Sequence, residues 1–191
     1  MSFLTEERAR AATPFRGRRL LAEAELRKSA ATASTTDFDV FLSHSVLDAE
    51  VIAGVKSLLE VRGLSVYVDW IEDPQLDRTH VTPKTAEILR TRMRHCKSLI
   101  FATSNSSPDS KWMPWELGYF DGFRPGHVAI LPLVKTTGSG FVGQEYLGLY
   151  PSIEDISFTD GDRTLGVFTN TARNRAAPIE TLMASGFRRR S

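Results

Sequence analysis

Strand-like and helix-like segments alternate along most of this chain, and that alternation is what most constrains its fold. Short apolar or β-branched runs predict strands at residues 38–43, 64–70, 98–103, 127–134 and 152–158. Apolar residues at helical spacing predict intervening helices at residues 47–62, 82–94 and 112–123. Short connections between such segments are typical of a parallel sheet with helices on both faces. We therefore expect an α/β fold.

Five parallel strands favour a flavodoxin-like sheet with the strand order 2-1-3-4-5. The direction of winding then reverses between the first and third strands, and ligands of open α/β sheets bind at the carboxyl edge of that point. Ser43, His44 and Ser45 end or follow the first strand, and Ser104 and Asn105 follow the third. We expect these polar residues to lie near one another at the sheet edge.

The beginning of the chain is predicted to lie outside the main domain, which we place at residues 37–173. Residues 1–36 have the composition of an appended N-terminal arm that is partly helical or disordered. Thr5 is a good cap for a short helix over residues 5–10, and a second helix is expected over residues 18–31. Packing of this arm on the domain or on a partner stays open.

Toward the end of the chain, the spacing of apolar residues gives weaker signals for strands and helices. Residues 152–158 are expected to form a short edge strand, and a final helix is expected over residues 162–173. Residues 174–191 form the expected C-terminal tail, which is predicted to be poorly ordered.

The composition is that of one globular domain of ordinary kind, with 191 residues, 41% hydrophobic and 25% charged. A net charge of +1 gives no reason to expect a nucleic-acid partner. No apolar run approaches the ~20 residues that a membrane helix needs. One cysteine, Cys96, excludes a disulfide framework and fits the reducing cytoplasm. The histidines lack metal-ligand spacing, so we predict neither a metal nor a bound cofactor.

Residues 111–118, with the sequence KWMPWELG, follow the predicted third strand and a polar loop. This order places Glu116 in the first turn of a helix beside Trp112 and Trp115. A carboxylate there can stabilise a developing cation while an indole stacks on a planar base, which suits cleavage of an N-glycosidic bond. Two plainer interpretations stay open: Glu116 at the positive end of the helix dipole, and a tryptophan packed in the core.

The candidate substrate contacts lie along the same predicted edge. They are Ser43, His44, Asp69, Trp70, Ser104 and Trp112. Hydroxyl and imidazole groups can bind a diphosphate or a ribose, a carboxylate can position a ribose hydroxyl, and indoles can stack on a base. Helix capping by the serines, a solvated loop histidine and a turn at Asp69 are equally open.

Residues 138–143 spell the glycine pattern G-x-G-x-x-G. A dinucleotide fingerprint requires a strand before this pattern and a helix after it, in the first βαβ unit. Here the pattern follows the fourth strand, and the residues up to Pro151 include Gly148 and cannot form a long helix. We interpret the segment as a flexible loop.

Three segments match one domain family in their order and spacing. Residues 39–45 (DVFLSHS), with Asp48 after them, resemble its opening strand, and residues 63–69 (GLSVYVD) resemble its second strand. Ser104 and its neighbours, followed by residues 112–117 (WMPWEL), resemble its serine-rich loop and Trp-x-x-x-Glu helix start. Over residues 39–156 the chain thus resembles the TIR (Toll/interleukin-1 receptor) domain family.

The resemblance implies a flavodoxin-like TIR fold and a choice between two kinds of function. Some TIR domains cleave NAD at the nicotinamide–ribose bond, and their catalytic glutamate corresponds to Glu116 here. The products are nicotinamide and ADP-ribose or a cyclised form. Stand-alone bacterial members, including the signal-producing component of the Thoeris anti-phage system, are the most similar. Self-association and a downstream effector that reads a nucleotide product are further implied expectations.

Two other functions stay open. One is a non-enzymatic TIR assembly module that associates through residues 71–82. The other is a nucleoside-processing relative, such as a deoxyribosyltransferase, which shares the sheet order and also uses a carboxylate.

Overall fold

The computed structural model describes residues 2–13, 37–45, 49–69, 80, 82–104, 110–157, 163–169 and 176–187. Its strands are β1 (Leu4–Thr5), β2 (Phe38–His44), β3 (Val66–Tyr67), β4 (Cys96–Ser104), β5 (Val128–Val134), β6 (Ser152–Ser157), β7 (Arg163–Phe168) and β8 (Ala177–Pro178). Its helices are α1 (Glu6–Ala11), α3 (Ala49–Glu60), α5 (Pro83–Arg94), α6 (Trp112–Phe123), the 3₁₀ helix η1 (Glu145–Leu149) and α7 (Glu180–Ala184).

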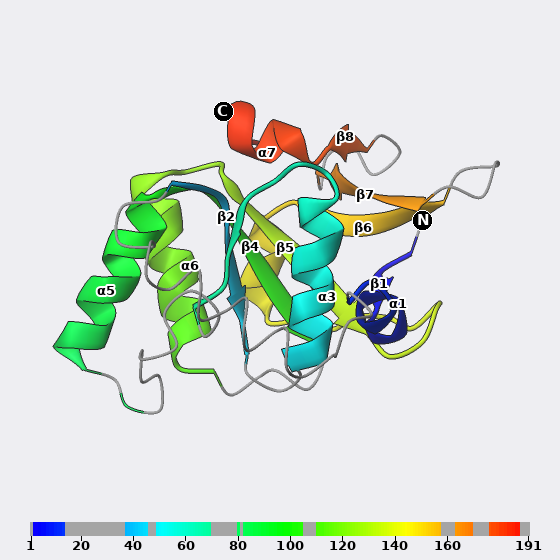
Figure 1. Ribbon diagram of the computed structural model, residues 1–191, viewed down its shortest axis with the longest axis horizontal. Helices are drawn as coiled ribbons and strands as arrows, with labels where there is room; N and C mark the ends of the chain where they lie inside the picture. Colours follow the sequence, from blue (N-terminus) through cyan, green and yellow to red (C-terminus); the bar gives the residue numbers. More distant parts are fainter. Residues whose placement is uncertain are drawn as a thin grey trace.

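The strands form one sheet in the order β3-β2-β4-β5-β6-β7-β8, with β1 paired to β5 (Figure 1). The first five, β3-β2-β4-β5-β6, are parallel and correspond to the predicted order 2-1-3-4-5. The flavodoxin-like α/β fold is therefore confirmed. The predicted count of five strands is wrong, because β7 and β8 extend the sheet in antiparallel pairs and β1 joins it at β5.

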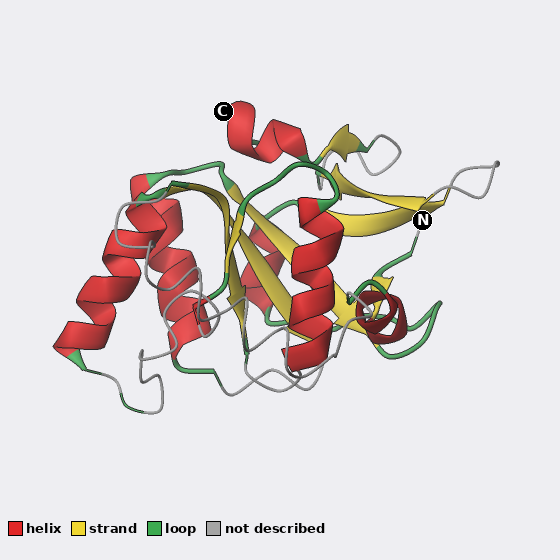
Figure 2. Cartoon of the chain, in the orientation of Figure 1, coloured by secondary structure: helices red, strands yellow, loops and turns green. Residues whose placement is uncertain are grey.

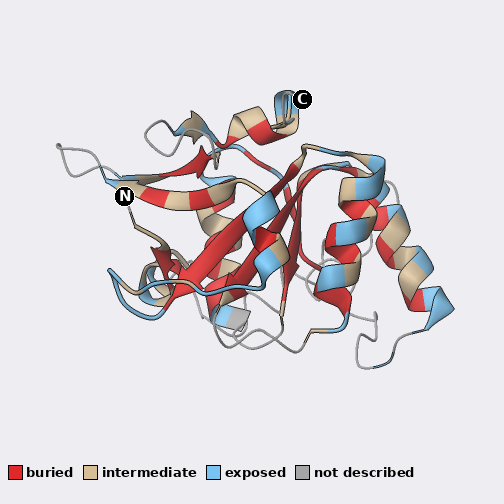
Figure 3. Cartoon of the chain, turned by 180° about the vertical axis from the view of Figure 1, so that it is seen from behind, coloured by how far each residue is buried: buried red, intermediate tan, exposed pale blue. Residues whose placement is uncertain are grey.

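Helices cover both faces of the sheet, with α1 and α3 on one side and α5 and α6 on the other (Figures 1 and 2). Helix α3 packs Val55 and Leu59 into a cluster with Leu42 of β2. Helices α5 and α6 pack Leu89 and Leu117 into a second cluster on the opposite face. The strands between these layers are almost continuously buried (Figure 3), as expected for parallel strands covered on both faces.

Helix ends follow the local signals in the sequence. The Thr82 hydroxyl accepts a hydrogen bond from the Thr85 backbone N–H at 3.1 Å, with Pro83 at the first position of α5. Gly63 follows α3 with φ = 77°, a left-handed conformation that terminates helices and favours glycine. None of the described helices combines the length and the apolar character that crossing a membrane needs.

The end of the domain differs from the sequence prediction. The helix expected over residues 162–173 is wrong, because Arg163–Phe168 is strand β7, paired antiparallel to β6. The strand expected at residues 152–158 is confirmed as β6, but its predicted position at the sheet edge is wrong, because β6 lies between β5 and β7. A Cβ atom on Gly166 would come within 2.3 Å of the Ile156 side chain. Close packing of neighbouring strands therefore explains a glycine that is unfavourable in either element on its own.

The C-terminal segment is also more structured than predicted. Within residues 176–187, Ile179 and Leu182 are fully buried in the cluster on the α3 face. The backbone N–H of Phe187 donates to the carbonyl of Gly126 at 2.6 Å. Poor order is thus a wrong prediction for this part of the tail, while residues 188–191 lie outside the described residues.

The described N-terminal residues pack on the domain, which was one of the arrangements left open for the arm. Leu4 pairs with Leu133 of β5, and Thr5 caps α1 as predicted, accepting from the Arg8 N–H at 3.2 Å. Ala9 is fully buried against α3, where a Cβ atom on Gly54 would overlap the Ala9 backbone. The second predicted helix, over residues 18–31, lies outside the described residues.

A buried carboxylate fastens this N-terminal segment to the sheet. Asp155 of β6 is fully buried and forms ion pairs with Arg8 of α1 and Arg163 of β7. Its backbone also pairs with Ser2, with hydrogen bonds of 3.2 and 2.8 Å. Burial and the neighbouring Arg163 lower the pKa of Arg8. The negative charge of one carboxylate therefore balances the positive charges of two guanidinium groups, which come from α1 and β7.

Replacing Asp155 with Asn should lower the free energy of unfolding by about 2 kcal/mol, because the half-buried Arg8 and the exposed Arg163 both lose a fully buried counter-charge. Urea denaturation measures this loss. Glu60→Gln removes a surface ion pair with Lys56 and is the control, with an expected change under about 0.5 kcal/mol. Equal stability losses in the two variants would contradict this assignment.

Cys96 should be unreactive in the folded protein. Its side chain is 1% exposed, and burial raises the pKa of its thiol. Because the thiolate is the reactive form, labelling by a disulfide reagent at pH 8 should be at least about a hundredfold slower than in urea-unfolded protein. Comparable labelling rates in the two states would show that β4 opens readily at its first residue.

Candidate functional site

A hydrogen bond between β2 and α6 holds Glu116. The Ser43 hydroxyl donates to Glu116 Oε2 at 2.7 Å, and both residues are fully buried. Side chains alternate along β2, so Ser43 lies on the α6 face with Phe41, while Leu42 faces α3. Glu116 lies on the buried side of α6, beside Met113 and Leu117. The structure thus brings together two residues that the sequence placed on separate segments of one sheet edge.

His44 and Asp69 form a second buried pair at the same edge. His44 ends β2, and its Nδ1 lies 2.9 Å from the Leu42 carbonyl oxygen. Because a carbonyl oxygen only accepts, Nδ1 carries the proton, and Nε2 faces Asp69 Oδ1 at 3.6 Å. The two side chains are 1% and 2% exposed. The alternative of a solvated loop histidine is therefore excluded.

The two tryptophans of α6 have different surroundings. Trp112 is 5% exposed and belongs to the core cluster of α5 and α6. Trp115 is half-buried, meets Trp112 edge-on at 5.5 Å and stacks on Tyr119 at 5.7 Å. The guanidinium of Arg90 on α5 lies 5.4 Å from the Trp115 ring centroid. Core packing accounts for most of the Trp112 ring, and its role as a stacking wall stays a prediction.

Ser104 lies at the end of β4 and lines a small cavity of about 70 Å³. The cavity lies against the start of α6, where the Ser110 hydroxyl accepts from the Met113 N–H at 3.2 Å. Phe141, Gly143 and Gln144 cover it, so the glycine-rich segment contributes a wall. That segment is a loop without a following α-helix, as predicted, and Gly138 has φ = 83°.

Several predicted features fall outside the described residues. Trp70 is one of them, as are residues 71–79, which include most of the proposed association segment. Within the described part, no group of three or more His, Cys, Asp or Glu side chains could hold a metal ion.

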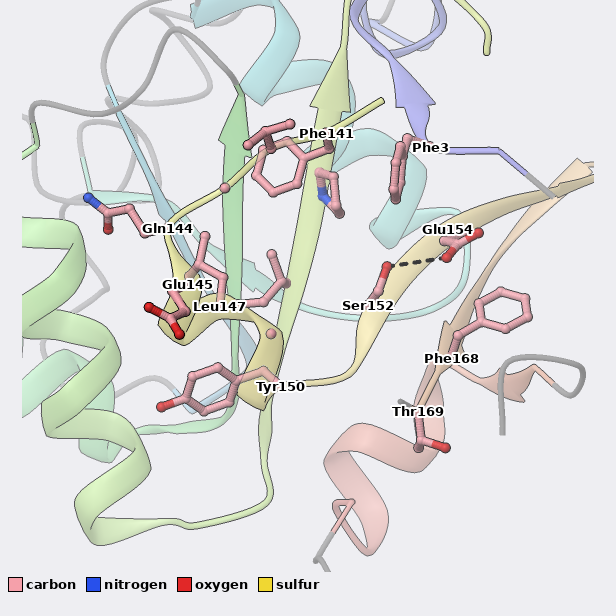
Figure 4. Close-up of a pocket in the computed structure, with 15 residues that line it drawn as sticks. Phe3, Phe141, Gln144, Glu145, Leu147, Tyr150, Ser152, Glu154, Phe168 and Thr169 are labelled. Carbon is pink, nitrogen blue, oxygen red and sulfur yellow. Dashed lines mark hydrogen bonds between the residues drawn. The ribbon is translucent and has the colours of Figure 1, made fainter. Parts of the chain in front are cut away.

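Sequence reasoning missed a larger cavity of about 430 Å³ on the α6 face of the sheet (Figure 4). Its walls come from Phe3 near the start of the chain, from residues 141–150 and from Phe168 of β7. These segments are far apart in the sequence, and β7 was predicted as a helix. The aromatic residues themselves were the available signal, but only the strand order brings them together.

The contribution of the Ser43 hydrogen bond can be measured with a double-mutant cycle. Ser43→Ala should lower the free energy of unfolding by about 2 kcal/mol, because it deprives a buried carboxylate of a donor. In a Glu116→Leu background the same change should cost under about 0.5 kcal/mol, because neither polar partner remains. Urea denaturation of the four proteins measures both. An equal cost of Ser43→Ala in the two backgrounds would rule out the coupling.

Comparisons with known proteins agree with the resemblance in the sequence. No protein-family model matches the chain. It is 60% identical over 117 residues to "Probable 3' cyclic ADP-D-ribose synthase ThsB'" of Bacillus cereus (strain MSX-D12), a match to 61% of this chain and 60% of that protein. It is 34% identical over 83 residues to "Putative cyclic ADP-D-ribose synthase TIR2" of Cytobacillus dafuensis, which covers 43% of this chain and 22% of that protein. The chain thus spans 60% or less of the length of these relatives. In sequence, the chain is similar to bacterial proteins named as cyclic ADP-D-ribose synthases, which agrees with the resemblance of its three motifs.

Proposed function

We propose that the chain cleaves the nicotinamide–ribose bond of NAD and releases nicotinamide together with a cyclic ADP-ribose-type product. The observation that carries this proposal is the Glu116 carboxylate, fixed by Ser43 at the carboxyl edge of the sheet where the strand order reverses. The relatives' names support it, since both denote cyclic ADP-D-ribose synthases.

The chemistry needs little beyond one well-placed carboxylate. Cleavage breaks the bond between ribose C1′ and the pyridinium nitrogen, and the electron pair leaves with nicotinamide as a neutral molecule. No general acid is required for that departure. The ribose becomes an oxocarbenium-like cation, which Glu116 stabilises electrostatically in a site that excludes water.

The fate of the cation decides the product. Attack by water, with loss of a proton, gives ADP-ribose. Attack by a nucleophile elsewhere in the same molecule closes a ring and gives a cyclic product. The cyclic outcome requires the two ends of the substrate to be held close together, which is an entropic advantage of a preorganised site. The names of the two relatives favour this outcome.

The other predicted contacts have subsidiary roles in this proposal. Ser43 orients the carboxylate and is a positioning residue rather than a direct substrate contact. The His44–Asp69 pair joins the ends of β2 and β3 and supports the site from the α3 side. Ser104, Trp70 and Trp112 remain the proposed contacts for the ribose and the planar bases. The reaction uses NAD as substrate and needs no further cofactor.

The resemblance to the TIR family also suggests what the reaction does in the cell. We infer that the product is a signal in anti-phage defence, read by a downstream effector, and that the chain works as a self-associated assembly. A non-enzymatic assembly module is the alternative, and the measurement of NAD cleavage separates the two.

Glu116→Gln should reduce nicotinamide release by at least about a thousandfold, because a neutral amide cannot balance the developing positive charge. The purified chain is incubated with NAD at high protein concentration, and the products are resolved by mass. The control is Glu87→Gln on the exposed side of α5, which should retain wild-type activity.

A cyclic co-product from the wild type would support the proposed cyclic ADP-ribose synthesis. Linear ADP-ribose as the sole co-product would show that the chain hydrolyses NAD without forming a ring. Full activity in Glu116→Gln would refute the role of this carboxylate. No nicotinamide release from the wild type at any protein concentration would favour the assembly module.

A further inference from the structure

The 430 Å³ cavity on the α6 face has the size of a small-molecule site. Figure 4 shows its walls: Phe3 and Phe141 at one end, Tyr150 and Phe168 toward the other, with Ser152 and Glu154 of β6 between them. Glu116 does not line this cavity. The cavity is therefore a second candidate site, built by different elements from those that hold the proposed catalytic carboxylate.

Charge limits what this cavity can hold. Two carboxylates, Glu145 and Glu154, belong to its lining, and no Lys, Arg or His is among the described residues that line it. Within the described part of the chain neither carboxylate has an ion-pair partner, and Glu154 only accepts a long hydrogen bond from Ser152 at 3.5 Å. A phosphate-bearing ligand would meet uncompensated repulsion. A neutral ligand would remove Glu154 from water without a counter-charge, which costs free energy.

Aromatic rings make up much of the remaining wall. Phe3 and Phe141 meet edge-on, with ring centroids 6.2 Å apart. The Tyr150 hydroxyl donates to Asp121 at 3.2 Å, and burial together with the Asp121 charge raises the pKa of Tyr150 to about 12. Tyr150 therefore stays a neutral phenol at physiological pH. Faces of such rings attract cations, and their planes favour flat ligands.

We propose that this cavity binds a small planar organic cation of the N-alkylpyridinium class. The ring of such a ligand stacks among the aromatic side chains, and its positive charge lies toward Glu154 and Glu145. The glycine at position 143 keeps this wall closely packed, because a Cβ atom there would come within 2.6 Å of the Phe141 ring.

The test compares two probes that differ by one methyl group and one charge, 1-methylnicotinamide and nicotinamide. Isothermal titration with the full chain, in the absence of NAD, gives the affinity of each. The cation should bind about tenfold more tightly than the neutral amide, an advantage that falls as salt is added. Glu154→Gln should weaken binding of the cation about fivefold and leave binding of nicotinamide unchanged.

Three further variants make the result specific. Glu145→Gln changes an exposed side chain and should also lower the affinity for the cation. This variant keeps the test decisive if Glu154→Gln is poorly folded. Glu87→Gln lies outside the cavity and should bind as wild type. Glu116→Gln should bind as wild type too, so binding here does not depend on the proposed NAD cleavage.

The proposal is overturned if the two probes bind equally, if neither binds, or if both cavity variants bind the cation as wild type does. Loss of cation binding in Glu116→Gln alone would also overturn it, by assigning the pyridinium ring to the proposed catalytic site. Failure of NAD cleavage with intact cation binding would instead affect only the proposed function.

Discussion

The packing layers on both faces of the sheet depend on one constraint, the parallel pairing of β2 with β4 at the centre of the sheet. It runs from Phe38 opposite Cys96 to His44 opposite Ala102. This pairing fixes which side chains of β2 face α3 and which face α6, because a shift of one residue would exchange the two faces. In the observed register Ser43 meets Glu116, and His44 lies at the edge beside Asp69.

Three buried carboxylates, Glu116, Asp69 and Asp155, lie in the described part of the fold. Buried carboxylates are costly unless donors or counter-charges compensate them. Glu116 has the Ser43 hydroxyl as a donor and Asp155 has two guanidinium groups as counter-charges, whereas Asp69 Oδ1 faces His44 Nε2 at 3.6 Å, beyond hydrogen-bond distance. Glu116 and Asp69 lie at the edge that parallel α/β folds use for chemistry, whereas Asp155 fastens the N-terminal segment. The same kind of group thus lies at the proposed reaction site in one place and fastens two segments of the chain in another.

Local patterns in the sequence predicted the central strands and the helix cap at Thr5. These patterns also predicted that Ser43 and Glu116 lie at the same edge of the sheet, because the strand order follows from the alternation of strands and helices. They failed at β7, where Gly166 and a short run allowed either a helix or a strand, and the neighbouring strand decided. The contact of Ser43 with Glu116 and the cavity beneath Phe141 depend on side-chain directions across segments far apart in sequence, which no local pattern contains.

The attachment of the N-terminal residues has a consequence for the order in which the chain folds. Leu4 pairs with Leu133, and Arg8 meets a carboxylate on β6 that also needs Arg163. During synthesis the first residues therefore leave the ribosome long before their partners exist, and contacts so distant in sequence are slow to form. Residues 4–8 are thus among the last to reach their place, and until then the side of β5 next to β1 is an open strand edge.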